Sequence, residues 1–140
     1  MENSILEKLQ YPIGKFKAPE RYSPEYIEEK IAIIASFPKR LTEEVLHLNN
    51  EQLDTPYRPG GWTIRQVIHH CADSHINCYV RIKWALTEET PTIKFYHEDR
   101  WSELKDNLTM PIEPSLLLLE GLHFRLAYLM KNLTEADLEK

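Results

Sequence analysis

The stretch PGGWTIRQVIHHCADSH, residues 59–75, is the part of the chain from which the fold is most directly inferred. Thr63 is followed three residues later by Gln66, which is a capping-box pattern: each side chain satisfies a backbone donor that the first helical turn leaves unpaired. The pattern predicts a helix that begins after Thr63 and continues to about Leu86 or Thr87.

Three of the six histidines lie in this helix, and the helical period places them on different faces. Taking Ile64 as the centre of the apolar face, at about 100° per residue, His75 lies roughly 20° from that centre and points inward. His70 lies on the flank, and His69 lies on another face. The ordinary interpretation is a core helix with one buried histidine, His75, and two surface histidines. The alternative is a metal site, because neutral imidazole is a common ligand of zinc and nickel.

Composition restricts the classes of partner. The chain of 140 residues predicts one compact domain, residues 1–140. Its 17 basic and 22 acidic residues give a mildly acidic protein, so nucleic acid and anionic membrane surfaces are not expected to bind it. The longest purely apolar run, Leu116–Leu119, is too short to cross a bilayer, and Met1–Gln10 lacks the apolar core of a signal peptide. These features predict a cytoplasmic protein.

Two further long helices are predicted, one before and one after the histidine helix. Ser23 and Pro24 are typical of an N-cap and a first helical position, and a kink is expected near Pro38. Pro114 opens the last long helix. Mostly apolar residues recur at three- and four-residue spacing in both helices: Ile27, Ile31, Ile34, Pro38, Leu41, Val45 and Leu48 in the first, and Leu116, Leu119, His123, Leu126, Met130 and Leu133 in the last. His123 is thus expected to face the core.

Three amphipathic helices predict an all-α bundle with one side left open. Residues 1–22 are interpreted as an N-terminal arm, because Pro12, Gly14 and Pro19 interrupt any regular period. An even number of helices closes a bundle more readily. We therefore expect either a longer natural chain, truncated here at its C-terminus, or a second copy that covers the open side as a homodimer.

Several short motifs resemble those of a known family. They are YPIG at 11–14, LDTPYR at 53–58, GGWT at 60–63, RQV at 65–67, HH at 69–70, DSH at 73–75, TEETP at 87–91 and WSELKD at 101–106. Together they extend over almost the whole chain and resemble the YfiT-like branch of the DinB superfamily.

The resemblance implies a four-helix bundle in up-down-down-up order, often dimeric, that acts as a metal-dependent hydrolase on a small molecule. In the family three histidines hold a divalent ion, zinc or nickel being the expected metals. The second histidine of the HH pair is one ligand, which corresponds to His70. The other two ligands form an HxxxH pair on the fourth helix, and no residues of this sequence correspond to them. The fourth helix is therefore expected to be missing from this chain.

The resemblance also leaves the reaction open between two chemistries. In the hydrolase hypothesis the metal activates water, and Asp73, about one turn from His70, is the candidate catalytic residue, acting as general base or orienting a ligand. In the second hypothesis the acceptor is a low-molecular-weight thiol, and the protein is a thiol S-transferase. A third hypothesis, from a different class, is a metal-free helical dimer that serves as a binding module.

Overall fold

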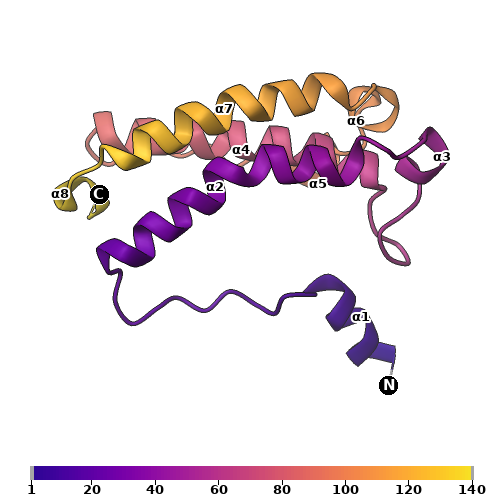
Figure 1. The fold of residues 1–140 in the computed structure, drawn as a ribbon, viewed down its shortest axis with the longest axis horizontal. Coiled ribbons are helices and arrows are strands. Elements are labelled where there is room, and N and C mark those ends of the chain that lie inside the picture. The colour runs from indigo at the N-terminus through magenta and orange to yellow at the C-terminus, as the bar shows by residue number, and fades with distance from the viewer. Residues whose placement is uncertain (1, 140) are drawn as a thin grey trace.

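The computed structural model describes residues 2–139, with side chains from residue 5 onward, and is built of helices (Figure 1). The expected all-α class is confirmed. The helices are α1 (Glu2–Gln10), α2 (Pro24–Val45), α3 (Asn50–Leu53), α4 (Ile64–Thr87), α5 (Glu98–Trp101), α6 (Lys105–Thr109), α7 (Glu113–Lys131) and α8 (Glu135–Leu138). Within the described residues α2, α4 and α7 are the long helices, as predicted.

The predicted helix starts are confirmed by their caps. The Ser23 hydroxyl accepts a hydrogen bond from the Tyr26 backbone N–H at 3.2 Å, at the start of α2. At the start of α4 the capping box is complete: the Gln66 N–H donates to the Thr63 hydroxyl at 3.1 Å, and the Thr63 N–H donates to the Gln66 side chain at 2.9 Å. Each bond satisfies a donor that the first turn leaves unpaired.

Helix α2 passes through Pro38 without a break, but its axis changes direction near the middle of the helix (Figure 1). Proline has no backbone N–H, so the carbonyl four residues earlier, that of Ile34, lacks its usual helical donor. The ring also crowds that carbonyl, which bends the helix. The expected kink is thus present within one continuous helix.

The three long helices are arranged as expected for the first three helices of an up-down-down-up bundle. In Figure 1, α2 runs in one direction, and α4 and α7 both run in the opposite direction. Helix α7 packs against both α2 and α4. The parallel pair needs a long connection, and residues 88–112 provide it, returning along the bundle through α5 and α6 (Figure 1).

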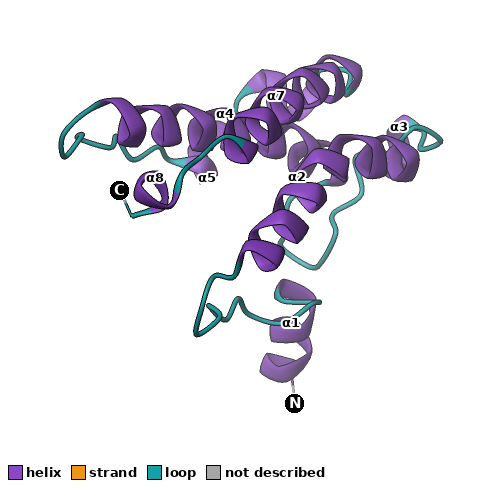
Figure 2. Cartoon of the chain, turned by 60° about the vertical axis from the view of Figure 1, so that its left-hand side comes forward, coloured by secondary structure: helices purple, strands orange, loops and turns teal. Residues whose placement is uncertain are grey.

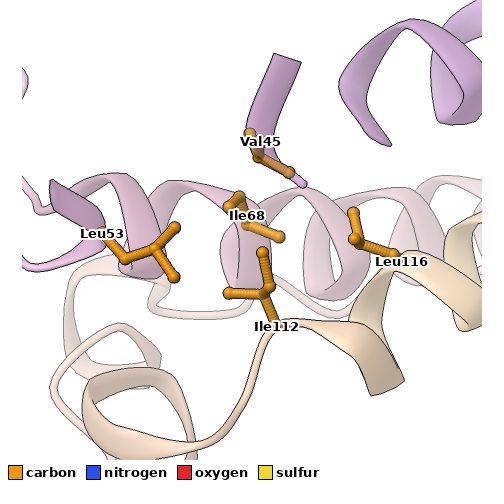
Figure 3. Close-up of a cluster of buried hydrophobic side chains, with 5 residues drawn as sticks. All are labelled: Val45, Leu53, Ile68, Ile112 and Leu116. Carbon is orange, nitrogen blue, oxygen red and sulfur yellow. The ribbon is translucent and has the colours of Figure 1, made fainter. Parts of the chain in front are cut away.

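The core lies where the C-terminal end of α2, the first turns of α4 and the start of α7 meet. Figure 3 shows a cluster of five buried side chains there: Val45, Leu53, Ile68, Ile112 and Leu116. Ile68, at the centre of the view, is only 1% exposed. At roughly 25 cal/mol for each Å² of apolar surface removed from water, burial of such side chains is the main stabilising contribution in this region.

Helix α1 and residues 11–22 precede the bundle and lie to one side of it in both views (Figures 1 and 2). Their large apolar side chains are exposed, Ile13 and Phe16 most of all. No helix in the described part of the chain is both long and apolar enough to cross a membrane.

Candidate functional site

His69 is buried, so the expectation of a surface position for this histidine is wrong. Its side chain is only 3% exposed. One ring nitrogen, Nδ1, lies 2.8 Å from the Ser115 hydroxyl, and Nε2 lies 3.2 Å from the Met110 carbonyl. The helical period of α4 alone does not show that the connection between α4 and α7 returns over this face and covers it.

These contacts give His69 a structural role. A carbonyl can only accept, so Nε2–H of His69 donates to Met110, and the remaining nitrogen accepts from the Ser115 hydroxyl. Burial lowers the pKa of His69, which keeps the ring neutral. Both nitrogens are therefore engaged, and no lone pair is left for a ligand.

Two further side chains of α4, Arg65 and Gln66, hold the same region together. Arg65 is 5% exposed and forms an ion pair with Asp54 at 2.7 Å. It also donates to Asn50 Oδ1 at 2.9 Å and to the Met110 carbonyl at 3.0 Å. Gln66 donates to the Ser102 carbonyl at 2.9 Å. Together they fix the first turns of α4 against α3 and against the connection that precedes α7.

His70 follows His69 on α4, and its ring lies against Trp62. The ring centroids are 4.7 Å apart and the planes are inclined at 56°. His70 is half-buried, and burial lowers its pKa, while the negative charges of Asp73 and Glu98 act in the opposite direction. Among the described residues no hydrogen bond engages either ring nitrogen. His70 is therefore a neutral imidazole with a lone pair free to bind a ligand.

A cavity of about 430 Å³ opens beside this ring. Its walls come from the C-terminal half of α2, the loop before α4 and the first turns of α4. The walls are almost entirely apolar, with Leu41, Val45, Tyr57, Trp62 and Val67 among the lining residues. Among these lining residues, His70 is the one whose side chain commonly binds metal ions. Such a cavity suits the apolar part of a small ligand, with one nitrogen atom available to orient it.

The loop that carries Trp62 is closed by backbone hydrogen bonds. The Tyr57 N–H donates to the Trp62 carbonyl at 3.0 Å, and the Ile64 N–H donates to the Thr55 carbonyl at 3.1 Å. A side chain at Gly61 would come within 2.7 Å of Arg58 Cγ and within 2.9 Å of the Tyr57 ring, so glycine is needed there. Gly61, the second glycine of the GGWT motif, therefore lets the loop fold tightly and place Trp62 against His70.

Asp73 lies about one turn after His70 and contacts the connection that covers α4. Its Oδ2 accepts a hydrogen bond from Asn107 Nδ2 at 3.2 Å. Burial raises the pKa of Asp73, and the hydrogen bond from Asn107 opposes part of that rise. Asn107 is 2% exposed, and its Oδ1 has no hydrogen-bond partner in the described part of the chain. Sequence reasoning selected Asp73 but missed Asn107, because nothing in its sequence context distinguishes it from a loop residue.

The raised pKa of Asp73 predicts that this carboxylate destabilises the fold at neutral pH. Between the unfolded value near 3.8 and the higher folded value, the native state binds more protons than the unfolded state, so stability falls as pH rises. Asp73→Asn keeps an acceptor for Asn107 and removes the charge. We expect its free energy of unfolding to exceed that of the wild type at pH 7, with the difference shrinking toward pH 4.

Urea denaturation at the two pH values measures this difference. Asp99→Asn, at an exposed position of α5, is the matched control, and its difference from the wild type should be small at both pH values. An Asp73→Asn protein that is less stable than the wild type at pH 7 would contradict the interpretation.

The metal-binding residue types of the described chain do not by themselves form a complete metal site. In residues 2–139 no three histidine, cysteine, aspartate or glutamate side chains lie close enough together to hold an ion. Catalytic zinc normally takes three protein ligands. His70 can supply one donor, and Asp73 lies nearby, but the set is incomplete.

Comparison with known proteins gives the family. The model of the DinB superfamily matches residues 35–140. A "Putative metal-dependent hydrolase" of Geobacillus thermodenitrificans is 49% identical over 98% of this chain and 77% of its own length. This chain belongs to the DinB superfamily. A Bacillus cereus relative with the same name is 48% identical over 96% of this chain and 78% of its own length.

A solved structure supports the same assignment of fold. YfiT from Bacillus subtilis, described as a probable metal-dependent hydrolase with an unusual four-helix bundle topology, matches with a TM-score of 0.90 at 48% identity. The match covers 93% of this chain and 74% of that chain. The expected YfiT-like fold is thereby confirmed. The DinB relatives are also longer than this chain, since it covers about three quarters of each.

Proposed function

We propose that this protein is a metal-dependent hydrolase that acts on a small molecule, with His70 as one ligand of a divalent ion, zinc or nickel. The observation that carries the proposal is the neutral imidazole of His70 in the wall of an apolar cavity, with no hydrogen bond from the described residues to either ring nitrogen. The names of the DinB relatives, metal-dependent hydrolases, support it. Within the described residues no three metal-binding side chains lie close enough together to hold the ion, so the proposed site requires donors in addition to His70.

The residues around His70 would then have separate roles in binding and in catalysis. The cavity binds the apolar part of the substrate, and Trp62 holds the His70 ring in a fixed orientation. A bound ion would supply Lewis-acid chemistry at this edge of the bundle. Asp73, whose raised pKa brings its titration closer to neutral pH, is placed to take or return a proton, with Asn107 holding one of its oxygens.

The proposal is tested by measuring metal content and hydrolysis together. The purified protein is assayed for bound zinc and nickel, and its hydrolysis of a panel of small esters, amides and phosphoesters is followed before and after chelation. We expect chelation to abolish hydrolysis and added zinc or nickel to restore it. Hydrolysis that persists in the fully chelated protein would overturn the proposal.

The same panel separates the hydrolase from the thiol S-transferase hypothesis. Product analysis with water alone, and then with a low-molecular-weight thiol added, shows which acceptor is used. A hydrolase gives the same product in both reactions. A product that carries the thiol would instead favour the transferase, and a protein that neither binds metal nor turns over any substrate would favour the binding module.

We also propose that the protein associates with a second copy through α7. Large apolar side chains lie exposed on one face of this helix: Leu117, Phe124 and Tyr128, at 69%, 75% and 69% exposure. Phe124 and Tyr128 also line a groove between α2 and α7. Large exposed apolar side chains that share one face of a helix are typical of an interface.

Light scattering is expected to give the mass of a dimer. Phe124→Glu should shift it to that of a monomer, because a charge would have to be buried in the interface. Leu46→Glu, at an exposed position on the end of α2, should leave the dimer intact. A wild-type protein that is monomeric at all concentrations would exclude this interface.

A further inference from the structure

His75 and His123 form a hydrogen-bonded pair between α4 and α7 that the proposed function does not use. The His75 Nδ1 atom lies 2.8 Å from the His123 Nε2 atom, and His123 Nδ1 lies 2.6 Å from the Ile34 carbonyl. The two rings lie at a centroid distance of 4.8 Å, and the Phe37 ring lies about as close to each of them, at 5.2 and 5.1 Å. The three long helices thus meet at this pair.

The Ile34 carbonyl can accept the hydrogen bond from His123 because of Pro38. Within α2 the backbone N–H of residue 38 would normally donate to the Ile34 carbonyl, and proline has no such hydrogen. His123 takes the place of the missing donor, at 2.6 Å. A buried carbonyl without a partner is costly, so this bond is strongly favoured.

The direction of every hydrogen bond follows from that carbonyl. The Ile34 oxygen can only accept, so the proton of the His123 ring must be on Nδ1. Burial lowers the pKa of His123 and keeps that ring neutral, so its Nε2 carries a lone pair. That lone pair accepts from His75, whose proton must therefore also be on Nδ1.

The Nε2 atom of His75 is left without a proton. Burial, then electrostatic interaction with the nearby His123 and His70 rings, lowers the pKa of His75 to about 4, so the ring stays neutral at pH 7. Among the described residues no hydrogen bond engages this Nε2, and it is not one of the buried atoms there that lack a partner. The atom therefore reaches solvent, as expected for a half-buried ring.

We infer that Pro38 and His123 are positioning residues that hold His75 in its Nδ1–H form, and that the Nε2 of His75 is thereby kept as an unprotonated hydrogen-bond acceptor open to solvent. This acceptor is separate from His70, which lies five residues earlier on α4. The inference does not depend on the proposed hydrolase activity. It assigns an acceptor atom whose protonation state is set by a proline on a different helix.

The tautomer is read directly from long-range 1H–15N spectra of the ring nitrogens at pH 7. We expect His75 and His123 both to show protonated Nδ1 and unprotonated Nε2, with a hydrogen-bonded Nδ1–H signal for each. The exposed His47 serves as a reference ring, and each signal is assigned by substitution. A wild-type spectrum in which His75 carries its proton on Nε2 would overturn the inference without any variant.

Two substitutions at His123 separate a positioning role from simple packing. His123→Gln retains a donor and an acceptor and should keep His75 in the Nδ1–H form, whereas His123→Phe retains the ring shape but removes both and should give a mixture of tautomers. Equal His75 spectra in the two variants would contradict the inference. If His123→Phe fails to fold, the wild-type spectrum and the Gln variant still decide it.

The free lone pair is tested with diethyl pyrocarbonate, which modifies unprotonated imidazole nitrogens. In the folded wild-type protein we expect modification of His75 and protection of His123, both of whose nitrogens are engaged. Mass mapping of the peptides distinguishes the two sites. Modification of His123 ahead of His75, or protection of both, would mean that Nε2 of His75 is not available.

Discussion

His70→Ala is expected to lower the affinity of the protein for zinc or nickel by more than about 100-fold, because loss of an outer hydrogen-bond partner of a metal ligand already costs about 10–100-fold. His70 has a neutral ring and a free lone pair. Calorimetric titration of the wild type and the variant with each metal measures the loss. The same variant should lose the hydrolysis that depends on the metal.

His75→Ala is the comparison for this prediction. The Nδ1 of His75 is bound to His123, and His75 does not line the cavity beside His70, so its removal should change metal affinity far less than removal of His70. Both variants remove an imidazole of the same helix, which controls for the general effect of truncation. Equal losses, or a larger loss for His75→Ala, would reverse the roles assigned to these two histidines.

Ile68→Ala is expected to lower the free energy of unfolding by about 2–5 kcal/mol, the range for truncation of a large aliphatic side chain in a packed core. Ile68 is 1% exposed and packs within the cluster formed by the ends of three helices (Figure 3). Few rearrangements can fill the resulting space, because its neighbours come from different helices. Urea denaturation measures the change.

Leu46→Ala is the matched control for this truncation. Leu46 is 68% exposed at the end of α2, so its loss should change stability by less than about 0.5 kcal/mol. Similar losses in the two variants would mean that the cluster around Ile68 is not the region where the bundle is most tightly packed.

Local signals in the sequence were sufficient to predict the long helices. Ser23 and Thr63 each bond to a backbone N–H in the first turn, so the start of each helix is determined by residues within four positions of it. Pro38 bends a helix through its own backbone chemistry. The inward position of His75 also followed from the helical period. These features depend on neighbours along the chain and can be inferred without tertiary contacts.

The surroundings of the site depended on contacts that the sequence does not indicate. His69 was expected at the surface and is buried, because the Met110 carbonyl and Ser115, both over forty residues away, lie against it. Asn107 reaches Asp73 in the same way. Helical periodicity gives the direction in which a side chain points, but it does not show which other segment packs over that face of the helix. Here the long connection between α4 and α7 packs over it.

The most direct test of these assignments is a zinc titration followed through the ring nitrogens of all the histidines of the protein by 15N NMR. Both nitrogens of His69 and the Nδ1 of His75 are engaged in hydrogen bonds, whereas no hydrogen bond in the described part of the chain engages either nitrogen of His70. We predict that the His70 signals change at the lowest zinc concentrations while those of His69 and His75 do not. Changes at His75 and His123 that precede any change at His70 would contradict the central claim that His70 is the metal-binding residue of this chain.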